Sequence, residues 1–599
     1  MNQLQYQSIN GKFLYYAFVS GGNRVLENQA ELNRINVFPV NDKDTGTNLA
    51  STVRFVMDNI RPSRSFKETL SNISEAALMG ARGNSGVIFA QFLHGLSRET
   101  ANKHRISFAE FAESVKKTIP YVYEAISNPV EGTMITVIKE WSEFINDKKE
   151  SVRDFEKVMS ESLSVLKKSL SETTEKLKAL NKTGFVDAGA KGFVLFINGV
   201  IEFMKERNIR SLVSPSQEPI SLVHTEEITN EHIVHRFCTE AIIKNLNKSK
   251  EELRQFLGQN GDSVVVAGSE STCRIHLHTN NPADLFYQLK DMGTISFQKV
   301  DDMVKQQEAA TKRKWNIALV TDSTCDLSQD ILDHYQVHSV PVSLNFGENH
   351  FLDKVTIWPD QFYKMLETSD VFPQTSQVNV QSFTNTYSHL AGHYDAIIAI
   401  NLSSQFSGTY NSSVKAAERI EKEFNKPVRV IDSKNISGGL GLLVLRAAKL
   451  IEEGHDLDFI LNSIESDVKQ TKIFVAVRDI KNLIRSGRVS KPKGMVASLL
   501  GLIPVISIDE NGKSQMFEKT FSQRSSLNKI YKHVAKIGKE KNVWNYTIMH
   551  AHNHNLAKEI ENKMKEIFEK EPLSVVDISP AIGMHAGIGS VGISVMFQN

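Results

Sequence analysis

The segment 36–48, NVFPVNDKDTGTN, has the composition of a metal and phosphate site. Its loop carries Asp42 and Asp44 two residues apart, just ahead of an amphipathic stretch. Mg²⁺ prefers oxygen ligands, so the two carboxylates can share one ion or bind two while ATP phosphates supply further ligands. A simpler alternative is that both aspartates only cap a turn and the start of a helix.

Small and hydroxyl-bearing residues add phosphate donors to this segment. Thr45, Thr47 and Asn48 place hydroxyl, amide and backbone N–H groups where the positive end of a helix dipole meets an anion. Two later segments, GARGNSGVIFAQF (80–92) and FVDAGAKGF (185–193), also put small residues at the entrance of an apolar helix. Three such loops favour a nucleotide site over simple capping.

A second set of chemically active side chains lies near the middle of the chain. Cys238 is followed by the H-x-H pair of His276 and His278. On a strand, residues two apart face the same side, so the two imidazoles and the thiolate can bind one zinc ion, with Glu240 as a candidate fourth ligand. The alternative is a pair of surface histidines and a buried cysteine without a metal.

The last part of the chain is rich in polar loops that follow apolar runs. PQTSQVN carries Thr375 and Ser376, NLSSQFSGTYNS carries Ser403 and Ser404, RSGRVSK carries Arg488, and HAGIGSVG carries His585. Such loops suit a carboxylate or an acyl phosphate, although serine-rich loops are often only turns and caps. A Ser404–His585 hydrolase pair is a rival, but the chain has no G-x-S-x-G elbow.

The spacing of apolar residues predicts three folded parts. Residues 1–206 show helical periodicity, as at Leu49, Val53, Val56 and Ile60, and residues 207–231 have the composition of a linker. Residues 232–314 alternate in the manner of strands around one helix, which predicts a small α+β domain. Residues 315–599 alternate short strands with helices, which predicts an α/β domain with a largely parallel sheet.

The overall composition excludes several classes of protein. A formal net charge of +1 over 599 residues gives no general attraction to nucleic acid. Three scattered cysteines do not form a disulfide framework, and the N-terminal residues lack the apolar run of a secretory signal. We therefore expect a cytoplasmic protein without a membrane span, which would hold any lipid in a pocket.

The strings NVFPVNDKDTGTN, GARGNSG, EGTMITV and VDAGAKG resemble the dihydroxyacetone-kinase L-type (DhaL, DAK2) ATP-binding domain in the form found in fatty-acid kinase A. The resemblance implies an α-helical barrel that binds ATP and Mg²⁺. It assigns Asp42 and Asp44, with Asn36 as a further candidate, to the metal. The residues it assigns to the nucleotide are Thr45, Thr47, Asn48, Ser85, Gly86, Asp187, Gly189 and Gly192. Lys43 replaces the usual glycine of DGDTG, which puts the efficiency of catalysis in question.

The strings FCTEAIIKNL and GDSVVVAGSESTCRIHLHTNNP are similar to the middle domain of fatty-acid kinase A and support zinc at Cys238, His276 and His278. VTDSTCDL, PQTSQ, LSSQFSGTYNSS and HAGIGSVGI resemble the DegV family of two-lobed fatty-acid-binding proteins. That resemblance assigns the lipid carboxylate to Thr375 and to Ser404 or its neighbour Ser403, with Ser376 and His585 nearby. It makes Arg488 and Arg524 candidates for the transferred phosphate.

Together these resemblances imply a fused fatty-acid kinase that converts ATP and a long-chain fatty acid into ADP and an acyl phosphate for phospholipid synthesis. They also imply a homodimer, an acyltransferase or separate fatty-acid-binding proteins as partners, and allow peripheral membrane contact. Three alternatives stay open. They are a nucleotide-regulated lipid carrier or sensor, a glycerone (dihydroxyacetone) kinase, and a C-terminal domain that only docks separate fatty-acid-binding proteins.

Overall fold

The computed structural model describes residues 7–37, 45–124, 126, 129–181, 183–206, 233–269, 271–486 and 503–598. The chain forms two compact units. Met1–Asn280 and Met292–Asp301 make the first, and Asn281–Asp291 and Asp302–Asn599 make the second. The proposed linker, 207–231, lies outside the described residues. None of the described helices is long and apolar enough to cross a membrane.

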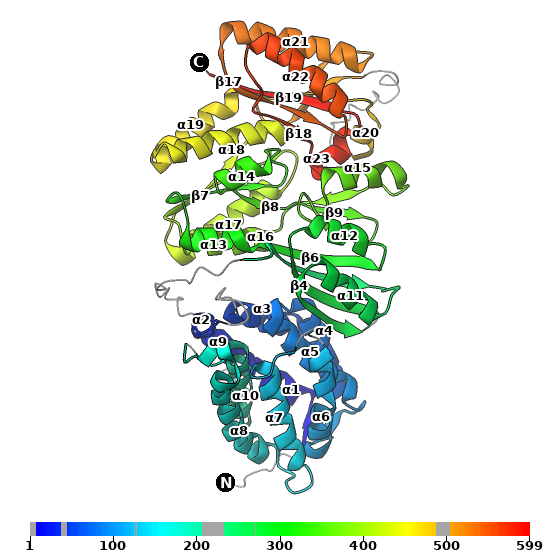
Figure 1. Ribbon diagram of the computed structural model, residues 1–599, viewed down its shortest axis with the longest axis vertical. Helices are drawn as coiled ribbons and strands as arrows, with labels where there is room; N and C mark the ends of the chain where they lie inside the picture. Colours follow the sequence, from blue (N-terminus) through cyan, green and yellow to red (C-terminus); the bar gives the residue numbers. More distant parts are fainter. Residues whose placement is uncertain are drawn as a thin grey trace. The chain divides into compact units, whose positions relative to one another are not determined.

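The N-terminal part of the first unit is a helical domain, coloured blue to cyan in Figure 1. A short antiparallel pair, β1 (Ser8–Asn10) and β2 (Arg105–Ser107), accompanies the helices. The helices are α1 (Gly11–Glu27), α2 (Gln29–Arg34), α3 (Thr45–Asn59), α4 (Phe66–Gly80), α5 (Gly83–Glu99), α6 (Phe108–Glu124), α7 (Met134–Asp147), α8 (Phe155–Lys176), α9 (Lys178–Asn181) and α10 (Ala188–Glu206).

Apolar residues at helical spacing build one core inside this domain. Leu49, Val53 and Val56 on α3, and Ile60 directly after it, are all at most 2% exposed, which confirms the predicted buried face. Aromatic rings from α5, α7 and α10 meet edge to face at the centre, where the ring centroids of Phe92 and Phe193 lie 5.6 Å apart. The helices are thus fixed against one another, and their ends can hold a site.

A four-stranded sheet of order β4-β5-β3-β6 completes the first unit. Its strands are β3 (Phe237–Lys244), β4 (Asp262–Ser269), β5 (Thr272–Thr279) and β6 (Thr294–Asp302), and α11 (Lys250–Asn260) begins with a capping box at Ser249. The α+β prediction is confirmed. The predicted alternation is wrong for β3, β4 and β5, because each of them has a run of consecutive residues that are buried on both faces of the sheet.

The second unit contains the predicted parallel sheet, of order β13-β12-β7-β8. Its strands are β7 (Ile317–Asp322), β8 (His338–Val340), β12 (Ala396–Asn401) and β13 (Val428–Asp432). Successive residues of β12 serve opposite faces. Ile397 and Ala399 pack in one core with Phe383, whereas Ile398 and Ile400 pack in another with the apolar residues of α18 (Ser437–Glu452).

The remaining sheets of the second unit differ from the prediction. A three-stranded antiparallel sheet has the order β10-β9-β11, and a six-stranded sheet has the order β16-β15-β14-β19-β17-β18. In the larger sheet only β17 and β18 are parallel among the pairings described. The strands are β9 (Ser343–Phe346), β10 (Asn349–Leu352), β11 (Gln374–Ser376), β14 (Thr471–Ala476), β15 (Val505–Ile508), β16 (Ser514–Glu518), β17 (Asn542–His550), β18 (Ser574–Asp577) and β19 (Val591–Gln598).

The prediction of a largely parallel sheet is therefore correct for the four-stranded sheet of this unit and wrong for its three-stranded and six-stranded sheets. The helices of this unit, seen from green to red in Figure 1, cover the sheets. They are α12 (Pro282–Leu289), α13 (Met303–Thr311), α14 (Gln329–His334), α15 (Pro359–Thr368), α16 (Val380–Ala391), α17 (Thr409–Phe424), α18, α19 (Leu457–Gln470), α20 (Lys481–Ser486), α21 (Gln523–Glu540), α22 (His554–Phe568) and α23 (Pro580–Ala586).

Candidate functional site

The start of α3 borders the predicted metal loop. Asp42, Lys43 and Asp44 lie outside the described residues. Asn36, just before them, is 2% exposed, and Thr45 opens α3 and is also buried. The backbone N–H of Thr47 donates to the Asn33 Oδ1, and the Asn33 Nδ2 donates to the Thr47 hydroxyl. Both hydrogen bonds are 2.9 Å long. These bonds hold the first turn of α3 against α2.

The loop before α5 packs directly on α3. Gly83 has φ +57°, a left-handed conformation that favours glycine, and a Cβ there would collide with the side chain of Asn48. The N–H of Arg82 donates to the Thr52 hydroxyl at 3.1 Å, and a Cβ on Gly86 would meet that hydroxyl at 2.5 Å. The glycines are thus needed because the backbone of α5 begins in contact with α3.

Asp187 joins the starts of α7 and α10. Its carboxylate accepts hydrogen bonds from the backbone N–H of Ala190, at 2.7 Å, and of Met134. Burial raises its pKa to about 6, and these two hydrogen bonds oppose the rise. A Cβ on Gly189 would meet the Ser85 hydroxyl at 2.8 Å, so the start of α10 also contacts the start of α5.

The starts of four helices therefore converge through packed contacts: α3 touches α5, α5 touches α10, and α10 shares Asp187 with α7. Each helix start carries the positive end of a dipole, which suits phosphate oxygens. The backbone N–H groups of Thr47, Gly83, Met134 and Ala190 already donate to protein oxygens. Gly192 differs from the other predicted residues, because a Cβ there would meet Leu49 at 2.5 Å in the core. Its smallness lets α10 approach α3 closely.

The structure brings Cys238, His276 and His278 together at the register where β3 pairs with β5. The Cys238 Sγ lies 3.9 Å from the His276 Nδ1, and the two imidazole centroids lie 5.2 Å apart. Burial lowers the pKa of His278 to about 4, so this imidazole is neutral at pH 7, as a metal ligand must be. The cluster has the thiolate and imidazole composition that zinc prefers.

The sequence suggested Glu240 as a fourth zinc ligand, but its contacts in the structure indicate a different role. Its carboxylate forms a buried ion pair with Arg274 and accepts a 2.9 Å hydrogen bond from the backbone N–H of Gly83. Arg274 also donates to the carbonyl oxygens of Leu78 and Met79 at the end of α4. The pair thus joins the sheet to the loop before α5. Sequence reasoning missed this link, and its one signal is a charged residue inside the apolar strand FCTEAIIK.

In the second unit, two predicted carboxylate-binding loops lie against each other. Thr375 and Ser376 are on β11, and the backbone N–H of Val378 donates to the Thr409 hydroxyl at 3.2 Å. Ser403 is fully buried, and its hydroxyl donates to the carbonyl of Gly512 at 2.8 Å. Ser404 is only partly buried, which leaves it as the better candidate of the two for a ligand.

His585 lies on α23, whose position is set by buried aspartates. The backbone N–H of Ala581 donates to Asp353, and that of Ser579 donates to Asp326, both at 3.1 Å. Ser323 donates to the other oxygen of Asp353 at 2.6 Å. Ser323 therefore helps to anchor this interior, and Asp322 does so too, because it accepts a 2.8 Å hydrogen bond from the backbone N–H of Leu402. Neither residue caps a helix, since the next helix, α14, begins after Ser328. Arg488 lies outside the described residues, and Arg524 is in the first turn of α21.

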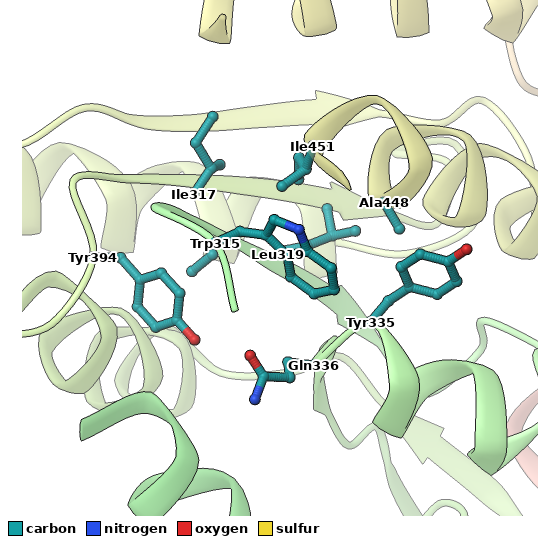
Figure 2. A pocket seen from close by; sticks show the side chains of 9 residues that line it. Trp315, Ile317, Leu319, Tyr335, Gln336, Tyr394, Ala448 and Ile451 are labelled. Carbon is teal, nitrogen blue, oxygen red and sulfur yellow. The ribbon is translucent and has the colours of Figure 1, made fainter. Parts of the chain in front are cut away.

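A small cavity in the second unit lies away from these loops (Figure 2). Trp315, Ile317, Tyr335 and Tyr394 are among its lining residues, around the amino end of β7. The polar loops follow the carboxyl ends of β7 and β12, which are parallel. The cavity has room for about one water molecule, so it is not a site for an acyl chain.

Models of three families match successive parts of the chain. A DAK2 domain model matches residues 39–202, a model of the middle domain of fatty acid kinase A-like (FakA-like) proteins matches residues 234–310, and the DegV family model matches residues 316–598. In order, these matches correspond to the N-terminal helical domain, the domain with the four-stranded antiparallel sheet and most of the second unit.

Individual relatives match about half of the chain. An uncharacterized protein of Staphylococcus saprophyticus is 34% identical over 319 residues, which are 51% of this chain and 57% of that protein. An uncharacterized protein of Staphylococcus epidermidis is 30% identical over 317 residues, with the same two shares. The chain thus spans little more than half the length of the curated relatives it matches.

Among solved structures, DegV of Bacillus subtilis, described as a fatty acid binding protein, is 27% identical and covers 48% of this chain and 100% of its own, with a TM-score of 0.44. A DegV family protein from Thermus thermophilus is 25% identical and covers 47% of this chain and 100% of its own, with a TM-score of 0.43. By its family matches, the chain carries a DAK2 domain, a FakA-like middle domain and a DegV family domain in one polypeptide.

Proposed function

We propose that this protein is a fatty-acid kinase, which transfers the γ-phosphate of ATP to the carboxylate of a fatty acid held by its DegV domain. The three domains together support a fatty-acid kinase or fatty-acid-binding role. The observation that carries the kinase proposal is the convergence of the starts of α3, α5, α7 and α10 around Ser85, Asp187 and Gly189.

That convergence suits the triphosphate of ATP. Four helix dipoles offer positive potential there, beside the carboxylate of Asp187. The oxygen ligands of Asp42 and Asp44, with Asn36 beside them, fit Mg²⁺, which would offset the negative charge of the phosphates when bound. Asn48 and Ser85, at the starts of α3 and α5, would position the nucleotide.

On the lipid side, Thr375 and Ser404 would donate hydrogen bonds to the fatty-acid carboxylate, with Ser376 and His585 near it. Arg488 and Arg524 would hold the transferred phosphate. A carboxylate oxygen then attacks the γ-phosphorus in line, and the bond from that phosphorus to the β,γ-bridging oxygen breaks. ADP leaves, and the product is an acyl phosphate. The chemistry needs no enzyme nucleophile, because it depends on positioning and charge stabilisation.

The first experiment measures ADP production by the purified full chain with Mg-ATP, in the presence and absence of oleate or palmitate. The product is trapped with hydroxylamine as a hydroxamate, which reports an acyl phosphate directly. We expect fatty-acid-dependent turnover that is lost in the Asp42→Ala, Asp44→Ala double variant. Asp58→Ala, on the exposed face of α3, serves as the matched control and should keep full turnover.

The other functions give distinct results in the same assay. Binding of oleate without turnover in every variant would contradict the kinase and favour a lipid carrier or sensor. Turnover with dihydroxyacetone but not with fatty acid would favour a glycerone kinase. If mass spectrometry found no fatty acid in the purified protein and none bound when added, a docking role would replace lipid binding. Light scattering tests the proposed homodimer, which a monomer at working concentration would exclude.

A further inference from the structure

We propose a second zinc site in the DegV domain, formed by His550, His554 and Asp577. His550 is the last residue of β17, Asp577 is the last residue of β18, and His554 is the first residue of α22 (Figure 1). One ligand atom from each of the three lies within 4.8 Å of the other two. None of these three residues is among those assigned to the nucleotide or to the lipid.

The parallel pairing of β17 and β18 aligns His550 directly with Asp577. The His550 Nδ1 and the Asp577 Oδ1 lie 3.0 Å apart. Among the described residues, neither atom has a hydrogen-bond partner, although both are buried. The His550 side chain is only 3% exposed, so this nitrogen is shielded from solvent. A buried imidazole nitrogen and a carboxylate oxygen that meet without a hydrogen bond are costly unless a ligand pairs with both.

A zinc ion would satisfy both atoms. Two ligands of one tetrahedral zinc lie about 3.3 Å apart when each bond is about 2.0 Å long. The observed 3.0 Å separation is close to that distance. Imidazole ligands favour zinc and related transition metals over Mg²⁺ or Ca²⁺, which prefer oxygen.

The chain between the two histidines is bent so that His554 reaches the same point. His552 adopts φ +53°, a left-handed conformation that is uncommon outside glycine. As a result, the rings of His550 and His554 lie 4.4 Å apart between centroids. Three protein ligands with one open position are the usual composition of a zinc site that admits water or an exchangeable ligand.

A neighbouring set, Asp360, His552 and His554, could compete for the same ion because it shares His554. The His552 Nδ1 lies 3.5 Å from the Asp360 Oδ1, and the Asp360 side chain is 63% exposed. Exposed carboxylates remain hydrated and need no metal. The pair of His550 and Asp577, whose side chains are 3% and 25% exposed, is therefore the better site, with His552 and Asp360 beside it.

The site is tested by zinc titration of the full chain after chelator treatment, in a Cys238→Ser background that removes the other candidate site. We expect one equivalent of Zn²⁺ to bind, and His554→Gln and Asp577→Asn each to weaken binding by at least tenfold, because loss of even an outer partner costs about 10–100-fold. His455→Gln, which changes a partly exposed histidine elsewhere in the unit, is the control and should retain the ion.

Because both His554→Gln and Asp577→Asn are measured, the test remains valid if one of them folds poorly. Circular dichroism checks the fold of each variant. Unchanged zinc binding in both His554→Gln and Asp577→Asn would overturn the proposal. It would also be overturned if His552→Gln and Asp360→Asn lost the ion while Asp577→Asn kept it. Absence of any bound zinc in the Cys238→Ser background would have the same consequence.

Discussion

The carboxylate of Glu240, on a strand of the middle domain, accepts a 2.9 Å hydrogen bond from the backbone N–H of Gly83 at the first residue of α5. The two residues are 157 positions apart in the chain. Burial alone would raise the pKa of Glu240, but the charge of Arg274 and the interaction with His276 hold it well below its usual range. A carboxylate with a lowered pKa therefore fixes the start of a helix that we assign to the nucleotide site, beside the cysteine–histidine cluster.

Replacing Glu240 tests this link. Glu240→Gln leaves Arg274 buried without a counter-charge, and breaking a buried ion pair in this way costs about 3–5 kcal/mol. We expect a lower melting temperature and a higher KM for ATP. Glu251→Gln is the control, because the Glu251 side chain is 79% exposed and its pair with Arg254 contributes about 0–1 kcal/mol. Equal melting temperatures for the two variants would contradict the link.

The conformation of Gly83 gives a second prediction. Gly83→Ala introduces a Cβ at φ +57° that collides with Asn48, so α5 must shift away from α3. The backbone penalty alone is about 1–2 kcal/mol. We expect weaker ATP binding by isothermal titration. Gly258→Ala in α11 meets no atom within 4 Å and should stabilise the helix by about 0.5–1 kcal/mol. An unchanged ATP affinity in Gly83→Ala would argue against a nucleotide role for this loop.

Metal analysis checks the middle-domain cluster. Cys238→Ser and His278→Gln each remove a candidate ligand, so we expect each to lower the zinc content of the purified protein by about one equivalent. Cys273→Ala is the control, because the buried thiol of Cys273 donates to the Ser269 carbonyl instead. Mass spectrometry of the native protein gives the count. The same zinc content in all variants would favour the metal-free alternative.

Two adjacent serines should separate structure from lipid binding. Ser403→Ala loses the hydrogen bond to Gly512, and we expect it to lower the free energy of unfolding by about 1 kcal/mol with little effect on oleate affinity. Ser404→Ala should weaken oleate binding by about tenfold, as expected for a lost hydrogen bond to a charged group. Fluorescent fatty-acid displacement measures both. The reverse result would assign the carboxylate to Ser403.

Asp353 predicts how stability depends on pH. Burial raises its pKa from 3.8 to about 7, and the charge of Lys354 opposes the rise. Between these values the unfolded chain has lost the proton while the folded protein keeps it, so the free energy of unfolding falls as pH rises. The loss amounts to about 1.4 kcal/mol for each pH unit between the two pKa values and levels off above pH 7.

The matched variant is Asp353→Asn, which cannot titrate. We expect the difference in unfolding free energy between wild type and Asp353→Asn, measured by urea denaturation, to shrink from pH 4 to pH 7. A difference that stays constant across this range would show that Asp353 does not carry the pH dependence.

The order and type of most elements follow from the amino-acid sequence alone, since helical periodicity and strand runs are local properties of the chain. The pattern placed Leu49, Val53, Val56 and Ile60 on one buried face. It also led to the prediction of a zinc site at Cys238, His276 and His278, because residues two apart on a strand face the same side. The three resemblances identified the families, as the matches over residues 39–202, 234–310 and 316–598 confirm.

Which distant residues meet depends on the tertiary structure. Three features depend on contacts between segments that are separated in the sequence. They are the hydrogen bond of Glu240 to Gly83, the alignment of His550 with Asp577 and the antiparallel pairings of the six-stranded sheet. No local pattern encodes such contacts, since strand order and register are set by packing of whole faces. The same reason explains why only the structure shows that Gly192 packs against Leu49 and that Asp322 and Ser323 form buried hydrogen bonds.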